Sequence, residues 1–237
     1  MLLKNKQIKW KKLTKLVKNS KKNYGFKMKV LLVNGSPNRM GCTFTALSEV
    51  EKTLNEENIE TKIVHVGQKD IRGCTACMKC VDLGKCVYDD YVNEFIDFCR
   101  DFDGFIFGAP VYFASANSTL ISLLTRTFYA GRKSGGDSFR LKPGAAVVSA
   151  RRAGTTASID EINKFFSIAE MPIISSKYWN MVHGNTPDEV KQDEEGLQVM
   201  RTLGRNMAWF LKLKEAGEKA GIPLPESETP LRTNFIR

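Results

Sequence analysis

Residues 28–37, Met-Lys-Val-Leu-Leu-Val-Asn-Gly-Ser-Pro, begin with a short apolar run and end in turn-forming residues. Within them, Lys29–Val33 is almost continuously apolar, which is typical of a strand covered on both faces. The next residues, Asn34–Asn38, favour a loop, and a helix is expected from about Thr43 to Asn55. A buried strand that leads through a loop into a helix predicts an α/β fold.

The same alternation continues towards the C-terminus. Further strands are expected at Thr61–Val66, Gly104–Gly108, Ala145–Ser149 and Pro172–Ser175, the last at an edge. Further helices are expected at Tyr91–Arg100, Ser118–Tyr129, Thr155–Ala169 (with Thr155 or Thr156 as N-cap) and Pro187–Leu213. Such alternation builds a parallel sheet through right-handed crossovers. Residues 28–237 contain no repeat and no interior linker, so they are predicted to form one domain that ends in a long helix and a tail, lying on the surface or against a partner subunit.

The net charge of +10 is concentrated at the N-terminus. Residues 1–27 carry ten of the 36 Lys and Arg residues and none of the 26 Asp and Glu residues, so the charges of residues 28–237 balance. A neutral body does not indicate a nucleic-acid groove. Residues 1–27 are interpreted as a basic tail or as an amphipathic helix that could lie on an anionic surface. We favour the tail and expect no membrane contact, and no apolar run approaches the roughly 18 residues of a bilayer span.

Three strand-end loops are candidates for a binding site, because ligands of open parallel sheets bind where the strand order reverses. The first loop, residues 35–43, leads into a helix, and its backbone N–H and hydroxyl groups suit a phosphate. Its spacing matches neither the Walker pattern nor G-x-G-x-x-G, which disfavours a nucleoside triphosphate or a dinucleotide. The candidate residues in this loop are Ser36, Pro37, Asn38, Gly41, Cys42 and Thr43.

The other two loops carry aromatic and basic residues. Residues 109–117 offer aromatic side chains that can pack along an isoalloxazine ring; the candidates are Pro110, Val111, Tyr112 and Phe113. Residues 149–156 offer positive charge that would stabilise an anionic reduced flavin; the candidates are Ser149, Arg151, Arg152 and Gly154. Candidates for a catalytic role are Tyr112, Arg151 and, on a later segment with aromatic residues and a glycine, His183.

Four of the six cysteines, Cys74, Cys77, Cys80 and Cys86, have the spacing C-x₂-C-x₂-C-x₅-C. This crowding is poor for a disulfide framework and, with no recognisable secretory signal, predicts a reducing, cytoplasmic setting. Four compact thiolates suit a [4Fe–4S] cluster, whereas structural zinc generally uses two separated knuckles. Zinc, and free or redox-active thiols, remain alternatives. Cys99 is interpreted as an ordinary buried cysteine.

Met28–Pro37, Gly41–Thr43 and Gly108–Tyr112, in this order, resemble the NAD(P)H-dependent FMN reductase and iron–sulfur flavoprotein branch of the flavodoxin-like superfamily. The resemblance covers residues 28–237 and implies a doubly wound five-stranded parallel sheet in a three-layer α/β/α arrangement. It implies FMN, with its phosphate at the first loop and its ring beside the second, NAD(P)H as donor, and a homodimer or homotetramer. It also implies that a cluster at the four cysteines relays electrons to FMN. Cys42 departs from the pattern, because many relatives have Asn or Ser there.

We therefore expect an FMN-dependent oxidoreductase that passes electrons from NAD(P)H to a quinone, a small molecule or a protein. The protein would supply orientation and electrostatics, and the cofactor would carry the hydride transfer. The alternative is a non-enzymatic FMN and iron–sulfur carrier between redox proteins. A third hypothesis is an interaction protein that retains this fold without its cofactor.

Overall fold

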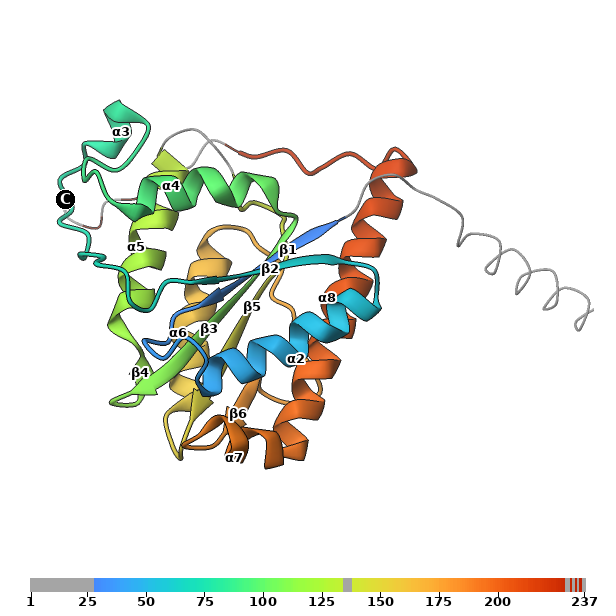
Figure 1. Ribbon diagram of the computed structural model, residues 1–237. Coiled ribbons are helices and arrows are strands. Elements are labelled where there is room, and N and C mark those ends of the chain that lie inside the picture. The colour runs from blue at the N-terminus through green and yellow to red at the C-terminus, as the bar shows by residue number, and fades with distance from the viewer. Residues whose placement is uncertain (1–27, 134–137, 229–230, 232, 234, 236–237) are drawn as a thin grey trace, which may run out of the picture.

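A computed structural model describes residues 28–133 and 138–228 together with residues 231, 233 and 235. Five parallel strands form a sheet in the order β2-β1-β3-β5-β6 (Figure 1). Their bounds are β1 Lys29–Asn34, β2 Glu60–His65, β3 Gly104–Tyr112, β5 Gly144–Ala150 and β6 Met181–His183. This is the flavodoxin-like strand order, whose switch point lies between β1 and β3. The expected five-stranded doubly wound sheet is confirmed.

Helices cover both faces of the sheet and make three layers (Figure 1). One face packs against α2 (Cys42–Glu56), α7 (Pro187–Gln192) and α8 (Glu194–Lys219). The other face packs against α4 (Tyr91–Phe98), α5 (Ser118–Lys133) and α6 (Thr155–Ile168). Alternate residues of β1 serve the two cores: Leu31 and Val33 face one, and Val30 and Leu32 face the other. Val30–Val33, the apolar part of the run that decided the fold, are therefore fully buried.

The edge strand was predicted in the wrong place. Within Pro172–Ser175 only Ile173 makes a bridge, to Gly144, and the edge strand is β6. Ile173 is partly exposed, whereas Met181 and Val182 are buried. The segment at 172–175 thus lacks a cover for one face, and the chain leaves the sheet before pairing again with β5.

The predicted helix Pro187–Leu213 is two helices, because Asp193 interrupts it. Asp193 caps α8: its Oδ1 accepts a hydrogen bond from the N–H of Gly196 at 2.9 Å. Its Oδ2 accepts another from the N–H of His183 at 2.7 Å. The carboxylate therefore joins the start of α8 to the end of β6, which a continuous helix would not allow.

Three further boundaries differ from the prediction. The residue before α6 is Gly154, at φ +97°, so neither Thr155 nor Thr156 caps that helix. The strand predicted to end at Gly108 continues to Tyr112 and pairs with the short antiparallel strand β4 (Ser115–Ala116). The helix predicted to end at Arg100 finishes as a 3₁₀ turn, Cys99–Asp101, in which Cys99 is buried as expected.

Of the two ends of the chain, only part of the C-terminal tail lies within the described residues. The alternatives for residues 1–27 lie outside the described residues. Residues 221–228, the part of the predicted tail that follows α8, are exposed, and this segment crosses from the end of α8 towards the α4 and α5 side (Figure 1). There, Nη2 of Arg140 donates to the carbonyl oxygen of Pro225 at 2.9 Å. Of the helices in the described ranges, none combines the length and apolarity that a bilayer-spanning segment requires.

Candidate functional site

The loop after β1 is fixed by its own polar groups. Oδ1 of the buried Asn34 accepts from the N–H of Ser36 at 3.1 Å, and its Nδ2 donates to the carbonyl of Arg39 at 3.0 Å. Oγ of Ser36 in turn accepts from the N–H of Asn38 at 3.2 Å. Asx and Ser turns of this kind hold a loop without regular structure. The first loop is therefore preformed.

Neighbouring segments hold the same loop from outside. Nε2 of His65 lies 2.7 Å from the carbonyl oxygen of Ser36, which gives this histidine a structural role. Nε2 of Gln68 donates to the carbonyl of Pro37 at 3.0 Å, and Nδ2 of the buried Asn117 donates to Gly35 at 2.8 Å. The loop is thus tied to β2 and to the start of α5.

Helix α2 begins at this loop with an uncapped N-terminus. Its N-cap, Gly41, has no side chain to accept a hydrogen bond, and the first turn has no acidic residue. The first helical bond runs from the N–H of Thr45 to Gly41 at 3.0 Å, so the preceding N–H groups of the turn are unsatisfied by the helix. The hydroxyls of Thr43 and Ser149, both buried, meet at 2.8 Å beside it. Unsatisfied N–H groups, the helix dipole and two hydroxyls together favour an anion.

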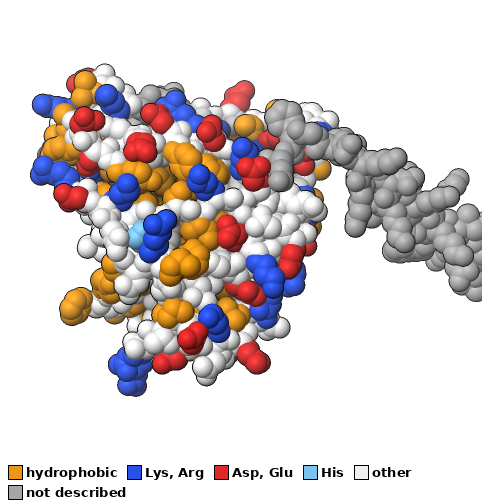
Figure 2. Space-filling view, viewed as in Figure 1, with side chains coloured by type: hydrophobic (Ala, Val, Ile, Leu, Met, Phe, Trp, Pro, Cys, Tyr) orange, Lys and Arg blue, Asp and Glu red, His pale blue; other side chains and the backbone are white. Residues whose placement is uncertain are grey.

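The second predicted loop is a β-hairpin with an exposed aromatic tip. Phe113 and Ala114 connect β3 to β4 at φ 51° and 60°. Positive φ at both positions is the geometry of a tight hairpin turn and costs of order 1–3 kcal/mol for each non-glycine residue. Phe113 is fully exposed (105%), and hydrophobic side chains project from the molecular edge that carries the hairpin (Figure 2).

Glu161 of α6 clamps this strained turn. Its Oε2 accepts from Oγ of Ser115 at 2.6 Å and from the N–H of Ala116 at 3.0 Å. The two bonds connect the strand after the turn to a rigid helix. They offset part of the backbone strain and fix the direction in which Tyr112 and Phe113 project.

The third loop packs against the hairpin through Gly154. A Cβ atom at Gly154 would lie 2.6 Å from Cα of Ala114 and 2.8 Å from Cγ1 of Val111, so only glycine permits this approach. Arg151 and Arg152 are exposed and make no hydrogen bond or ion pair with any described residue. Their charges are therefore available to an anionic group at this end of the sheet.

His183 lies beside the third loop, at the end of β6. It is paired with Ala150, and its side chain is exposed. Next to it, the carbonyl oxygen of Gly184 lies 3.6 Å from Sγ of Cys42, so the first loop and β6 are also in contact. Burial, opposed by a backbone hydrogen bond, raises the pKa of the Cys42 thiol, which favours its neutral form.

The structure thus brings together many of the predicted residues. Ser36, Asn38 and Thr43 share one corner with Ser149, and Val111 meets Gly154. Among the described residues, no hydrogen bond or ring contact joins Tyr112 to Arg151 or His183. Sequence reasoning missed the residues that support these loops. They are Asn34, Asn117 and Glu161; the available signal for Asn34 was its place as a polar residue at the end of an apolar run.

Replacing Glu161 with glutamine is expected to loosen the hairpin. Because one oxygen of Glu161 accepts both bonds, the amide oxygen of glutamine can keep them, but the acceptor loses its charge, which costs about 1 kcal/mol of stability. If the hairpin forms part of a flavin site, FMN binding weakens roughly fivefold. Thermal melts and flavin-fluorescence titrations measure both effects. Asp160→Asn, a change at the exposed neighbouring position, is the control and should change neither.

The four predicted ligand cysteines line one pocket, bounded by the loop around α3 (Cys80–Leu83) and by α5. Burial and the charges of the other three thiols raise the pKa of Cys80. Two non-glycine residues of the motif, Ala76 and Met78, have φ values of 52° and 60°. The loop is therefore tightly wound around a shared pocket.

The described residues contain no group of three or more His, Cys, Asp or Glu side chains arranged to hold a metal ion. The thiols thus surround a pocket without forming a completed ligand set. The donor types and their common pocket fit an iron–sulfur cluster. A buried arginine, Arg126, also lines the pocket and was not predicted. The sequence offered one indication that Arg126 is buried: it lies in a predicted helix close to the apolar residues Leu120, Leu123 and Leu124.

The sequence of this chain is similar to those of known proteins. A family model for NADPH-dependent FMN reductase matches residues 28–186. An iron-sulfur flavoprotein of Methanocaldococcus jannaschii is 32% identical over 197 residues, covering 78% of this chain and 98% of the relative. An iron-sulfur flavoprotein of Methanosarcina thermophila is 27% identical over 188 residues, covering 78% and 96%.

Solved structures support the fold. RosB, in a crystal structure with a bound 8-demethyl-8-formylriboflavin-5'-phosphate intermediate, superposes with a TM-score of 0.61 at 15% identity, covering 89% of this chain and 92% of that chain. A flavodoxin from the domain Archaea gives a TM-score of 0.53 at 13% identity, covering 78% and 99%. At sequence identities this low, the similarity to these structures shows a shared fold and nothing about function.

Proposed function

This chain belongs to the NADPH-dependent FMN reductase family, and on that premise we propose that it passes electrons from NAD(P)H through FMN to a quinone, another small molecule or a protein. The observation that carries the proposal is the uncapped start of α2 within a preformed loop. When bound, FMN supplies the redox chemistry by accepting a hydride and releasing electrons singly or in pairs. The chain binds the cofactor and orients it.

The phosphate of FMN is assigned to the first loop. The unsatisfied N–H groups of α2 and the hydroxyls of Ser36 and Thr43 would donate to it, with Ser149 beside them. Because Asn34 and Asn117 already hold the loop, little conformational entropy is lost on binding. Cys42 can contribute through its backbone N–H, so its difference from Asn or Ser does not disturb the site.

The flavin ring is assigned to the hairpin and the third loop. Pro110, Val111, Tyr112 and Phe113 offer apolar surface along one side. Arg151 and Arg152 would stabilise negative charge on the reduced ring. His183, exposed at the end of β6, is a candidate to contact the substrate.

A [4Fe–4S] cluster held by Cys74, Cys77, Cys80 and Cys86 is proposed as a second redox site. Helix α5 begins at Ser118, beside the first site, and passes the cysteine pocket at Arg126. The two residues are eight positions apart, or about 12 Å along the helix. One helix thus connects the two sites. The same pocket favours a second candidate function, that of a non-enzymatic carrier between redox proteins.

Anaerobic stopped-flow absorbance of the full chain reconstituted with FMN tests the proposal. We expect NADPH or NADH to bleach the flavin band in a single turnover. A protein whose flavin is bleached only by ferredoxin-type donors would be a carrier, and one that takes up no FMN would be an interaction protein. Either outcome would contradict the reductase. The acceptor, the oligomeric state and the cytoplasmic location remain predictions.

Acidic and basic side chains are interspersed on the face seen in Figure 2. No single-sign field covers that face, which agrees with the neutral charge of residues 28–237. The partners proposed are accordingly a nicotinamide nucleotide and an electron acceptor, and not a nucleic acid.

A further inference from the structure

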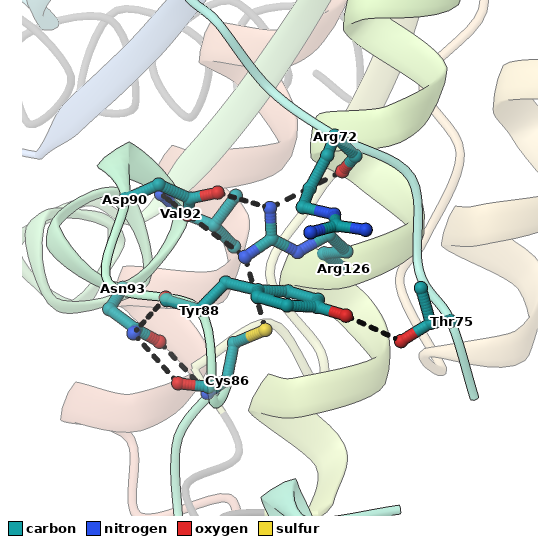
Figure 3. Close-up of polar contacts among 8 residues, drawn as sticks. All are labelled: Arg72, Thr75, Cys86, Tyr88, Asp90, Val92, Asn93 and Arg126. Atoms are coloured by element: carbon teal, nitrogen blue, oxygen red, sulfur yellow. Dashed lines mark hydrogen bonds and ion pairs between the residues drawn. The ribbon is translucent and has the colours of Figure 1, made fainter. Parts of the chain in front are cut away.

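Arg126 is buried to an extent that is unusual for a charged side chain. It is 1% exposed and is among the largest fully buried side chains in the described residues. Its Nη1 and Nη2 donate to the two carboxylate oxygens of Asp90 at 2.5 Å and 2.9 Å, and Nη1 also donates to the carbonyl of Arg72 at 3.3 Å. Nη2 donates as well to Sγ of Cys86 at 3.1 Å (Figure 3). Asp90 thus orients the guanidinium so that it meets a predicted ligand sulfur.

Cys86 is itself fixed at its backbone. Asn93 accepts from the N–H of Cys86 at 2.9 Å through Oδ1 and donates to its carbonyl at 3.0 Å through Nδ2. Nδ2 also donates to the carbonyl of Tyr88 at 3.1 Å. The sulfur and both backbone groups of Cys86 are therefore restrained (Figure 3), whereas Cys74 and Cys77 are exposed. Cys86 is therefore held at its sulfur and at its backbone, and it is less exposed than Cys74 and Cys77.

Tyr88 links this cluster to the start of the cysteine motif. Its ring lies 5.2 Å from the guanidinium carbon of Arg126 and 4.2 Å from that of Arg72. Its hydroxyl is 2.8 Å from Oγ1 of Thr75, next to Cys74. The two ends of the motif are thereby joined across one aromatic ring (Figure 3).

The charges of this cluster do not cancel. Two guanidinium groups, Arg126 and Arg72, face one carboxylate, Asp90, whose pKa is held low mainly by its hydrogen bond to Arg126 against the effect of burial. One positive charge therefore remains beside the pocket. In addition, Nε of Arg126 is buried with no hydrogen-bond partner among the described residues. Burying an arginine in this way is costly for stability alone, so its position calls for a role in the pocket.

We propose that Arg126 is a positioning residue of the cysteine pocket. It holds Cys86 in its ligand position and raises the reduction potential of the cluster bound there. The inference rests on the cluster part of the proposed function. Reduction adds one electron and one negative charge to the cluster and its thiolates, and no proton is required. A hydrogen-bond donor at one sulfur, with a surplus positive charge beside Arg126, stabilises that extra negative charge. Asp90 orients Arg126, and Tyr88 limits its exposure to solvent.

The test is an anaerobic redox titration of the reconstituted full chain with dithionite, followed by electron paramagnetic resonance, with iron, sulfide and FMN measured on each sample. Arg126→Met is expected to shift the cluster midpoint to more negative potential or to lose the cluster while retaining FMN. Arg126→Lys, which keeps the charge, should restore part of the shift. Arg205→Gln removes an exposed charge from α8, on the opposite face of the sheet, and should leave the midpoint unchanged.

If Arg126→Met does not fold because Asp90 is left unpaired, Asp90→Asn/Arg126→Met removes both charges and should still show the negative shift. Wild-type protein with no iron or sulfide after reconstitution would overturn both the cluster and this inference. A cluster whose midpoint is the same in wild type, Arg126→Met and the double variant would overturn this inference alone.

Discussion

Asn38→Asp is expected to weaken FMN binding by roughly thirtyfold, because it places a carboxylate on the loop assigned to the phosphate. Repulsion between a single charge and a phosphate several ångströms away, at the surface of a protein, costs about 2 kcal/mol. Asn38 is exposed, and its hydrogen bonds within the loop are made by its backbone N–H and carbonyl groups, so a change of its side chain should not unfold the chain. Quenching of FMN fluorescence measures the dissociation constant.

Asn55→Asp is the matched control for this variant. Asn55 lies near the other end of α2, thirteen residues after Cys42, or about 20 Å along the helix. The same change of charge there should leave FMN affinity unchanged. Equal losses in the two variants would indicate a general effect of charge on the protein and would contradict the assigned phosphate position.

Cys77→Ala is expected to remove nearly all of the iron from the anaerobically reconstituted protein and to leave the FMN content unchanged. Cys77 is exposed in the cysteine pocket, so its loss removes a ligand without opening the core. A cube held by three protein thiolates loses one of its four attachments. Iron, sulfide and flavin analyses on one sample separate the two cofactors.

Cys99→Ala is the control for Cys77→Ala. Cys99 is buried in the core beneath α4, and burial raises the pKa of its thiol far above the ordinary value. Its removal should leave the iron content unchanged. Full iron in Cys77→Ala, or zinc in the wild-type protein, would contradict the cluster and favour the zinc or free-thiol alternatives.

The sheet could be predicted because its strands are buried on both faces. Lys29–Val33 and Gly104–Gly108 are apolar runs bounded by turn residues, and both became central strands. The loop after β1 could be predicted as well, because Gly, Ser, Pro and Asn at the end of a strand favour turn conformations. These strands and this loop are determined by residues close together in the sequence, so they can be predicted without knowledge of distant contacts.

The differences arose where distant contacts decide the structure. Asp193 breaks a helical pattern because it also bonds to β6. Tyr112 extends β3 because a hairpin pairs with it, and Glu161, 45 residues from Ala116, stabilises that hairpin. Arg126 reaches Cys86 across 40 residues. Periodicity along the sequence carries no information about these pairings.

The affinity of Asn38→Asp for riboflavin, compared with its affinity for FMN, shows whether the first loop holds the phosphate. Riboflavin has the same ring but no phosphate, so we expect the variant to bind riboflavin as well as wild type does, while its FMN binding is weakened. Equal weakening for the two ligands would show that the first loop does not hold the phosphate.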